Sequence, residues 1–391
     1  MQSAYEIPSR IAETLTSFDY TPRTRLIFGP DTLERIGEVA RELGASRALL
    51  VTDAGIVAAG HAGRAVGFIA AAGLQVEVYD RVHENPTTRD VAECVEAARS
   101  ANADILIGLG GGSSMDTAKG CNFILSNGGE MKDYWGVGKA TKPMLPMVAV
   151  PTTAGTGSEC QSAALIADEA THQKMACLDP KVSARVAILD PLLTVSQPLR
   201  VTAATGIDAL THALETAVTR KRNGISTVFS HESFRLCFTS LSHVLENPGD
   251  LEARARMQLG AAYAGMAIEN SMLGAVHSAA NPLTAHHGVV HGQAVGVMMP
   301  AVMRFNARLP EVAAIYVDLA RGVGLPSVEA LADEFTALLA RSGLLAPLRD
   351  LSVQQDGIAG LAEEAAKQWT AQFNPREVTA EDFARMYEEA L

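Results

Sequence analysis

The chain has 391 residues, 48% of them hydrophobic, and a formal net charge of −12 at pH 7. This length supplies material for a sizeable core, and we expect two domains. The charge is spread along the chain without a polybasic block, which argues against nucleic acid or an anionic membrane surface as a partner. The purely apolar runs are far shorter than the roughly 20 residues that a membrane span requires.

The N-terminus and the cysteines indicate the compartment. Residues 1–10, MQSAYEIPSR, have no apolar core like that of a secretory signal. The five cysteines lie far apart in the sequence, and no two of them form a CxxC motif. This distribution is typical of reduced thiols in a cytosol. We therefore expect a cytoplasmic protein.

Short β-branched runs alternate with helical patterns in the first half of the chain. Strands are predicted at residues 24–28, 47–52, 75–79, 104–109, 147–150 and 184–189. Apolar residues at helical spacing lie between them, as at residues 31–43 and 88–101. This alternation predicts a parallel sheet with helices on both faces.

The β-rich runs stop at about Thr202. Helices are predicted at residues 203–218, 230–245, 250–269, 311–322, 327–342 and 357–373. Thr379, with Asp382 three residues later, resembles a capping box that opens a last helix. The composition changes near residues 190–202, so we predict an α/β domain at residues 1–198 and an all-helical domain at residues 199–391.

A glycine-rich turn follows the strand predicted at residues 104–109. Gly110, Gly111 and Gly112 precede a helical pattern, and glycines there let backbone N–H groups approach a pyrophosphate while the helix N-terminus favours its charge. The turn is not the full dinucleotide fingerprint, because Ser113 stands in place of the last glycine and no acidic residue follows about 20 residues later at the end of the next strand. A turn of this kind can also be purely structural.

Two other loops at strand ends strengthen the prediction of a nucleotide site. Asp53 ends the second strand, where its carboxylate could bind the hydroxyls of an adenosine ribose and repel the 2′-phosphate of NADP, which favours NAD. Asp53 could equally be a helix N-cap. Residues 151–159, PTTAGTGSE, place hydroxyls and glycines after the strand at 147–150, a composition that suits a loop facing a ligand.

Residues 271–300 contain no Lys, Arg, Asp or Glu but hold four of the ten histidines. Imidazoles in an apolar, uncharged segment indicate a buried site rather than a solvated face. Each one alone could be an ordinary core histidine. They are His277, His286, His287 and His291.

Upstream, Asp208 and His212 lie four residues apart, which places both on one face of a helix. A pair at this spacing is usually just an exposed helix face. With His277 and His291, separated by a Pro282 that should break the segment into two elements, the pair forms an N/O ligand set. Such a set suits Fe(II), Zn(II), Co(II), Ni(II) or Mn(II). The sequence predicts a divalent metal, and such a metal can bind an alcohol or carbonyl oxygen as a Lewis acid.

Together these segments resemble the iron-containing (group III) alcohol dehydrogenases along nearly the whole chain. The matching motifs include TRLIFGP at 24–30, GGGSSMDTAK at 110–119, PTTAGTGSE at 151–159, TAATGIDALTHALE at 202–215 and HG at 291–292. The resemblance implies an N-terminal dinucleotide-binding α/β domain and a helical metal-binding domain. It implies metal ligands at Asp208, His212, His277 and His291. It implies NAD contacts at Asp53, Asn85, Gly111, Gly112, Ser113, Asp116, Thr152, Thr153, Thr156 and Lys174.

The chain departs from the family pattern HxxxHPL at Asn281. The family's histidine at this position is a suspected proton relay, and an amide cannot exchange a proton near neutral pH. The catalytic candidates are therefore Asn281 itself and His287, with His286 as a further substitute. A second departure is Asp31, where a glycine is common, and we expect only a small change of the turn.

We therefore predict reversible hydride transfer between NAD and a small primary alcohol or its aldehyde. The expected metal is Fe(II), with Zn(II) or another divalent ion as alternatives, and the family implies a homodimer or larger homo-oligomer. One alternative is a hydroxyacid–oxoacid transhydrogenase of the same family, which would want an Arg or Lys for the substrate carboxylate. Another is a lyase resembling dehydroquinate synthase, which needs a basic pocket for a phosphate. Residues 271–300 contain no Lys or Arg that could form such a pocket.

Overall fold

The computed structural model describes residues 17–171 and 173–391, which divide into two units. Residues 22–198 and 249–265 form the first, which we call the sheet unit. Residues 17–21, 199–248 and 266–391 form the second, the helical unit. Residues 1–10, on which the expectation about a secretory signal rests, lie outside the described residues.

Six parallel strands form the main sheet of the sheet unit, in the order β1-β9-β6-β4-β2-β3. The inner strands β4 and β6 are buried along their whole length, as is typical of parallel strands covered on both faces. All six predicted strands are confirmed: β1 (Arg25–Phe28), β2 (Arg47–Val51), β3 (Gln75–Tyr79), β4 (Ile105–Gly110), β6 (Met147–Pro151) and β9 (Val186–Leu189).

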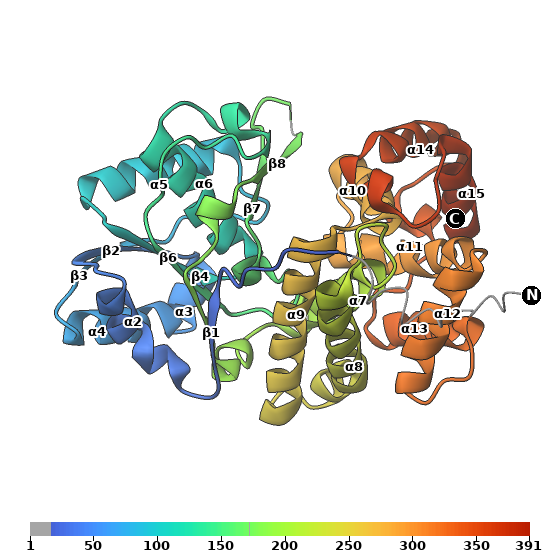
Figure 1. Ribbon diagram of the computed structural model, residues 1–391, viewed down its shortest axis with the longest axis horizontal. Coiled ribbons are helices and arrows are strands. Elements are labelled where there is room, and N and C mark those ends of the chain that lie inside the picture. The colour runs from blue at the N-terminus through green and yellow to red at the C-terminus, as the bar shows by residue number, and fades with distance from the viewer. Residues whose placement is uncertain (1–16, 172) are drawn as a thin grey trace, which may run out of the picture. The chain divides into compact units, whose positions relative to one another are not determined.

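Helices cover both faces of this sheet. On one face, Ile36 and Ile69 pack in a single buried cluster with strand residues such as Leu50 and Ile107. Figure 1 shows α2 to α4 on that side and α5 and α6 on the other. The predicted α/β architecture is therefore confirmed. The helices are η1 (Thr32–Arg35), α2 (Ile36–Glu42), α3 (Ala54–Ala58), α4 (His61–Ala71), α5 (Thr88–Ser100) and α6 (Gly112–Asn127).

The sheet unit also contains a small sheet that the sequence did not predict. Its order is β5-β8-β7, with β7 and β8 antiparallel. β5 has only two residues, and β7 contains a single β-branched residue and β8 none, so the β-branched runs that mark the main strands are missing here. The elements of this region are η2 (Met131–Tyr134), β5 (Gly136–Val137), η3 (Ser158–Cys160), β7 (Ala163–Ala167), β8 (Lys174–Leu178), η4 (Pro180–Val182) and η5 (Pro191–Thr194).

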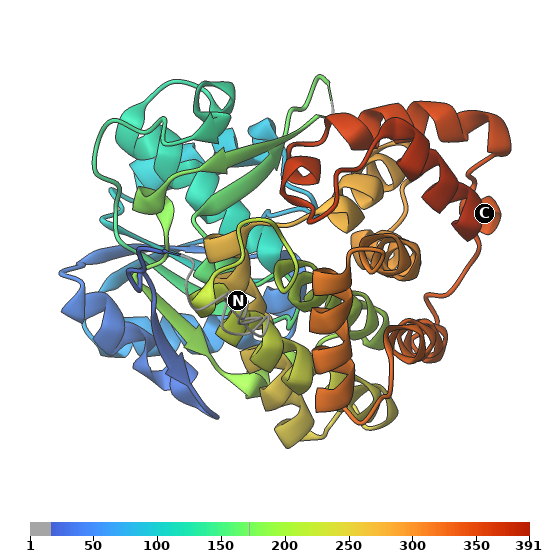
Figure 2. The same ribbon diagram turned by 45° about the vertical axis from the view of Figure 1, so that its right-hand side comes forward.

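The helical unit contains no strand among its described residues, and Figure 2 shows its yellow to red helices. Thr379 and Asp382 form the predicted capping box at the start of the last helix. The helix α9 is shared, since its residues up to Gly265 group with the sheet unit. The helices are α7 (Leu199–Thr216), α8 (Gly224–Glu246), α9 (Leu251–Ser271), α10 (Ala275–His287), α11 (His291–Asn306), α12 (Pro310–Gly322), α13 (Val328–Arg341), η6 (Leu348–Leu351), η7 (Gln355–Gly357), α14 (Ile358–Lys367), η8 (Trp369–Phe373) and α15 (Ala380–Ala390).

Pro282 does not break the histidine-rich segment, and that prediction was wrong. α10 runs through Pro282 and ends at His287. A proline inside a helix removes one backbone hydrogen bond, but the buried side of α10 keeps the helix intact around it. The division falls instead at Gly288, whose φ of 63° is the left-handed conformation that commonly ends a helix. The two elements therefore exist, with their boundary later in the chain.

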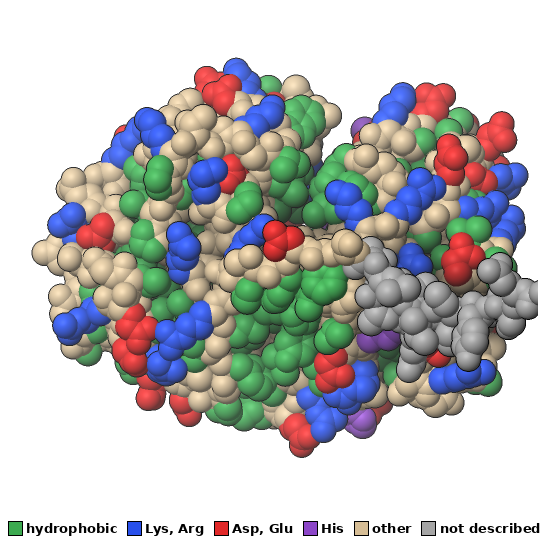
Figure 3. Space-filling view, viewed as in Figure 1, with side chains coloured by type: hydrophobic (Ala, Val, Ile, Leu, Met, Phe, Trp, Pro, Cys, Tyr) green, Lys and Arg blue, Asp and Glu red, His purple; other side chains and the backbone are tan. Residues whose placement is uncertain are grey.

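Three further properties concern membrane segments, cysteines and surface charge. Among the described residues, no helix is long and apolar enough to cross a membrane. The five cysteines are buried, and none forms a disulfide with another described residue. On the face shown in Figure 3, Lys and Arg side chains lie interspersed with Asp and Glu.

Candidate functional site

α7 carries Asp208 and His212 on one face, because four residues are about one helical turn. The two side chains are almost completely buried. The Nε2 atom of His212 lies 3.4 Å from Oδ1 of Asp208. The predicted pair therefore does not belong to an exposed helix face.

α10 and α11 bring two more histidines to the same carboxylate. The Nε2 atoms of His277 and His291 each lie 3.7 Å from Oδ1 of Asp208. The ring of His277 stacks on that of His212 at 4.8 Å between centroids. Asp208, His277 and His291 form a group in which one ligand atom of each lies within 4.8 Å of the others. His212 joins this group through its approach to Asp208.

The cluster fits a divalent metal ion in both chemistry and spacing. A tetrahedral ion with N and O ligands at about 2.0–2.2 Å separates its ligand atoms by roughly 3.3–3.6 Å, close to the distances around Asp208. Within the described part of the chain, Oδ1 of Asp208 and Nε2 of His277 are buried and make no hydrogen bond. Unsatisfied buried polar atoms cost free energy, and a metal ion between them would remove that cost.

The charges of the cluster favour a cation. Burial alone would raise the pKa of Asp208, but the imidazoles of His212, His277 and His291 hold it well below its usual range. Burial would lower the pKa of His277, but the carboxylates of Glu215 and Asp208 raise it to about 9. An ionised carboxylate therefore lies at the centre of the cluster and attracts positive charge from a proton or a metal ion.

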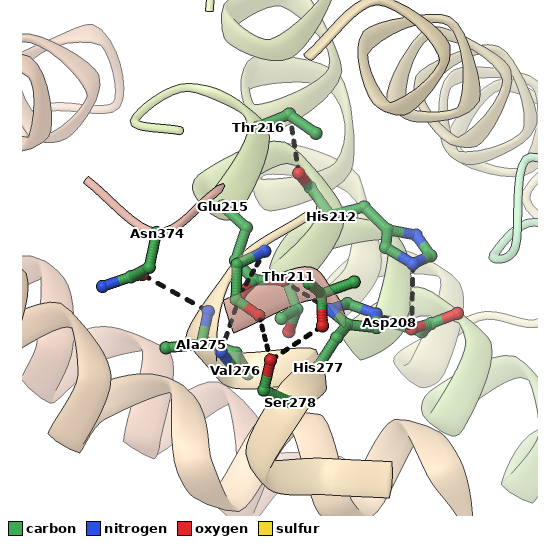
Figure 4. A network of polar contacts seen from close by, with 12 residues as sticks. Asp208, Thr211, His212, Glu215, Thr216, Ala275, Val276, His277, Ser278 and Asn374 are labelled. Atoms are coloured by element: carbon green, nitrogen blue, oxygen red, sulfur yellow. Dashed lines mark hydrogen bonds and ion pairs between the residues drawn. The ribbon is translucent and has the colours of Figure 1, made fainter. Parts of the chain in front are cut away.

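Glu215 is a site residue that the sequence analysis missed. It lies near the end of α7, and its buried carboxylate bonds with Nδ1 of His277 (Figure 4). The same carboxylate accepts hydrogen bonds from the backbone N–H groups of Gly274 and Val276, at 3.1 Å and 2.7 Å. The signal was present in the sequence, since Glu215 follows Asp208 by seven residues and therefore shares its helix face.

Gly292 lets the first turn of α11 approach α7. A Cβ atom at this position would lie 2.0 Å from the carbonyl oxygen of Ala204. A larger residue would have to push the two helices apart. Because His291 is the adjacent residue, Gly292 also sets how far the imidazole of His291 reaches toward Asp208.

The two proton-relay candidates occupy different places on α10. Asn281 lies one turn beyond His277, and its Nδ2 donates a hydrogen bond to Oε1 of Gln368 at 3.2 Å. His287 is the last residue of the helix, and a rise of 1.5 Å per residue puts its backbone about 15 Å along the axis from His277. His286 is exposed and pairs with Glu364 at 2.6 Å. A catalytic role for Asn281 or His287 stays a prediction, and of the two only Asn281 lies within one helical turn of His277.

The predicted nucleotide loops lie together at the carboxyl ends of β2, β4 and β6. β2 pairs with β3 on one side and with β4 on the other, so the order in which the strands are added across the sheet reverses between β2 and β4. Open α/β sheets bind ligands at such points. A Cβ on Gly110 would lie 3.3 Å from Oδ2 of Asp53. A Cβ on Gly112 would lie 2.9 Å from Cγ2 of Thr156, and one on Gly111 would lie 3.4 Å from Thr153.

Asp53 is an N-cap, one of the two roles that the sequence left open. Its Oδ1 accepts the backbone N–H of Ile56 at 3.1 Å, at the start of α3. Its other oxygen, Oδ2, lies on the side of Gly110. One carboxylate can therefore cap the helix and still present an oxygen to a ribose, and that second role stays a prediction.

A buried polar network joins the loop at residues 151–159 to α6. Lys119 donates hydrogen bonds to the carbonyl oxygens of Ser158 at 2.6 Å and Ala163 at 2.9 Å. The hydroxyl of Ser158 donates to Asp116 at 3.0 Å. Burial raises the pKa of Asp116, against the opposing effect of Lys119. Burial also raises the pKa of Glu159, to about 7.

The remaining predicted NAD contacts lie on either side of this network. Ser113 is in the first turn of α6, and Thr152 follows β6. Lys174 donates a hydrogen bond to Asn85 at 3.4 Å, and Asn85 has a left-handed backbone with φ 53°. Lys174 also lowers the pKa of Asp116. The structure thus gathers the glycine turn, Asp53 and the loop at 151–159, with Asn85 and Lys174 as a neighbouring pair.

Comparisons with known proteins find the same family in both halves of the chain. The sequence profile of the family described as "Iron-containing alcohol dehydrogenase" matches residues 22–191, and that of "Fe-containing alcohol dehydrogenase family, C-terminal" matches residues 202–391. The NAD-dependent methanol dehydrogenase of Bacillus methanolicus is 35% identical over 383 residues, which cover 96% of this chain and 100% of that protein.

Solved structures show the same fold. An alcohol dehydrogenase from Oenococcus oeni superposes with a TM-score of 0.91 at 30% identity and covers 96% of this chain and 100% of its own. Sulfoacetaldehyde reductase from Bifidobacterium kashiwanohense, solved in complex with NAD+, has a TM-score of 0.88 at 30% identity, with 96% and 99% covered. The chain therefore belongs to the iron-containing alcohol dehydrogenase family. The family and fold class inferred from its motifs are confirmed.

Proposed function

We propose that this protein catalyses reversible hydride transfer between NAD and a small primary alcohol or its aldehyde, with a divalent metal at Asp208, His212, His277 and His291. The observation that carries the proposal is the convergence of these four side chains from three helices. A buried carboxylate oxygen and a buried imidazole nitrogen there have no hydrogen bond among the described residues. The similarity to a methanol dehydrogenase supports a small alcohol as substrate.

The chemistry of the bound groups is general. A divalent ion acts as a Lewis acid toward an alcohol or carbonyl oxygen, and NAD accepts or returns the hydride. We propose Fe(II) as the resident ion because the family is iron-containing, while Zn(II) would suit the same N/O donors.

The chain's own residues orient the reactants and hold charge. Asp208 keeps a negative charge in a buried setting, with its pKa lowered by the surrounding imidazoles. Glu215 holds the ring of His277 through Nδ1. Asn281 is held through its Nδ2 by Gln368, so its Oδ1 is the atom left to accept a hydrogen bond from a substrate hydroxyl. Because an amide does not exchange protons near neutral pH, we assign Asn281 an orienting role.

In the sheet unit, we propose that the turn at Gly111, Gly112 and Ser113 binds the pyrophosphate of NAD through backbone N–H groups at the start of α6. Oδ2 of Asp53 would accept hydrogen bonds from the adenosine ribose and disfavour NADP. The other proposed contacts are Asn85, Asp116, Thr152, Thr153, Thr156 and Lys174.

The test is a screen of alcohols and aldehydes that follows NADH absorbance, with metal analysis of the same preparation. His277→Ala should lose both bound metal and turnover. His286→Ala removes an exposed histidine of the same helix and should keep both. Full turnover by metal-free His277→Ala enzyme would refute the proposal. Oxidation of a hydroxy acid without accumulation of NADH would point to a transhydrogenase, and turnover of a phosphorylated substrate without net NADH to a lyase.

We also propose a cytoplasmic homo-oligomer, a dimer or larger. The buried cysteines, which form no disulfide with any described residue, suit a reducing compartment. Light scattering coupled to size exclusion would measure the mass in solution, to be compared with the 41.2 kDa of one chain. A mass near that of one chain would refute the oligomer.

A further inference from the structure

We infer that Glu215 is the positioning residue of the metal centre, because it fixes which nitrogen of His277 faces the ion. This inference rests on the proposed function. Glu215 lies 3% exposed at the end of α7 and makes three contacts at once (Figure 4). Oε2 bonds with Nδ1 of His277, and Oε1 accepts the N–H groups of Gly274 and Val276.

The first role of Glu215 is to close the N-terminus of α10. The first N–H groups of a helix lack partners inside the helix, and α10 has no side-chain cap of its own. Glu215 accepts the N–H groups of Gly274 and Val276, while Oδ1 of Asn374 accepts that of Ala275 at 3.3 Å. A carboxylate at this end also complements the helix dipole.

The second role follows from the kind of partner that Glu215 is. A carboxylate only accepts hydrogen bonds, so Nδ1 of His277 must carry the proton between them. The other nitrogen, Nε2, lies 3.7 Å from Oδ1 of Asp208 and makes no hydrogen bond among the described residues. A neutral imidazole with its proton on Nδ1 has its lone pair on Nε2, and this is the tautomer that binds a metal at that position.

The two roles are linked, which makes Glu215→Gln a sharp test. A glutamine has one acceptor oxygen and one NH2 donor. The N–H groups of Gly274 and Val276 require the oxygen, so the NH2 group must face Nδ1 of His277. Nδ1 then has to accept a hydrogen bond, and the proton moves to Nε2, where it blocks the metal. If the amide turned the other way, its NH2 group would face the two backbone N–H donors, and neither would have an acceptor.

The experiment measures Co(II) and Zn(II) affinity of the full-length enzyme by chelator competition, and the visible spectrum of the Co(II) form. We expect Glu215→Gln to weaken binding by about 10–100-fold, as for other residues that orient a metal ligand, and to alter the Co(II) spectrum. In the Zn(II) form of the wild type, proton NMR should show a downfield Nδ1–H resonance of His277 that disappears in the variant.

Asn374→Ala is the matched control. Asn374 caps the same helix and also pairs with Asn306, but it has no contact with the imidazole of His277 among those described. We expect it to lower the melting temperature at least as much as Glu215→Gln while keeping metal affinity within about threefold of wild type. Glu215→Asp serves if the glutamine variant does not fold, because the shorter side chain keeps the charge and fails to span His277 and Val276 together.

The inference is overturned if Glu215→Gln, or Glu215→Asp in its place, binds Co(II) within threefold of wild type. It is also overturned if Asn374→Ala loses as much metal affinity as the Glu215 variant, since the residue would then act only through helix stability. These outcomes differ from failure of the proposed function, which would appear in the wild type as bound metal without alcohol oxidation.

Discussion

The two candidate sites treat their charged side chains in opposite ways. Around the nucleotide loops, Lys119 and Asp116 are hydrogen-bonded to neighbouring groups, and Asp53 caps a helix. In the metal cluster, Oδ1 of Asp208 and Nε2 of His277 are buried without a hydrogen bond among the described residues. Each charged side chain named in the first arrangement has a hydrogen-bond partner, whereas the second leaves two buried ligand atoms without one among the described residues.

This difference separates side chains that shape a site from side chains that bind. A phosphate is bound mainly by backbone N–H groups, so Lys119 and the capping oxygen of Asp53 serve to hold loops in place. A metal ion is bound by side-chain atoms directly. Single substitutions should therefore abolish the metal site, whereas substitutions in the loops should change stability or selectivity.

The largest expected effect is that of Asp208→Asn. The amide keeps the volume of the side chain but removes the charge that three imidazoles share. Metal affinity should fall by at least about 100-fold, and turnover should fall with it. Emission spectrometry of the purified protein measures the metal content. Asp116→Asn, which alters a buried aspartate of the sheet unit, should keep its full metal content, and equal loss in both variants would break the comparison.

Gly292→Ala should act on the metal cluster through packing. The added Cβ would lie 2.0 Å from a backbone oxygen of α7, so α11 must move and carry His291 with it. We expect a loss of about 3 kcal/mol of stability, the upper end for overpacking, together with weaker metal binding. Gly322→Ala is the control, because among the described residues no atom outside its own stretch of helix lies within 4 Å of its added Cβ. Unchanged unfolding and metal affinity in Gly292→Ala would contradict the close contact.

Features whose signal lies within a short stretch of sequence were predicted more completely than features that depend on contacts between distant residues. The six strands of the main sheet were predicted because each is a short apolar run with helical patterns on either side. The ligand types at Asp208 and His277 were predicted from chemistry alone. β7 and β8 were missed because β7 contains a single β-branched residue and β8 contains none.

Features that depend on packing between helices could not be predicted from local pattern. Glu215 shares a helix face with Asp208, but its partner His277 comes from α10, 62 residues later in the chain. The break at Pro282 was predicted from a local rule, and α10 overrides that rule because its end is set by Gly288. The close contact of Gly292 with Ala204 likewise depends on the packing of α11 against α7.

A pH-dependent effect tests the buried loop network. Burial raises the pKa of Glu159 from its ordinary 4.5 to about 7, so the folded state holds its proton more tightly than the unfolded state does. The resulting stability is fully present below pH 4.5 and is lost as the pH rises through 7. Glutamine resembles the protonated acid, so Glu159→Gln should gain about 2–3 kcal/mol relative to wild type between pH 5 and pH 8.

The measurement for Glu159→Gln is urea unfolding of both proteins at several pH values. The difference between the two curves isolates this one group from the other carboxylates. Metal content should not change, in contrast to Asp208→Asn. Parallel pH profiles for the two proteins would show that Glu159 does not titrate in this window.

The smallest expected effect concerns Asp53, where the two kinds of role meet in one side chain. Its Oδ1 caps α3, while Oδ2 on the side of Gly110 is proposed to select NAD. Serine keeps an acceptor at the N-cap and removes the negative charge. Asp53→Ser should therefore preserve the melting temperature and lower the ratio of kcat/KM for NAD over NADP by about tenfold, or roughly 1.4 kcal/mol.

Asp53→Ala separates the two roles of this residue. It removes both the charge and the cap, so it should show the same loss of cofactor selectivity as Asp53→Ser and lose a further ~1 kcal/mol of stability. A serine variant with the selectivity of the wild type, beside a destabilised alanine variant, would leave Asp53 with the cap alone. It would then join Lys119 and Asp116 among the residues that shape the nucleotide loops without choosing the ligand.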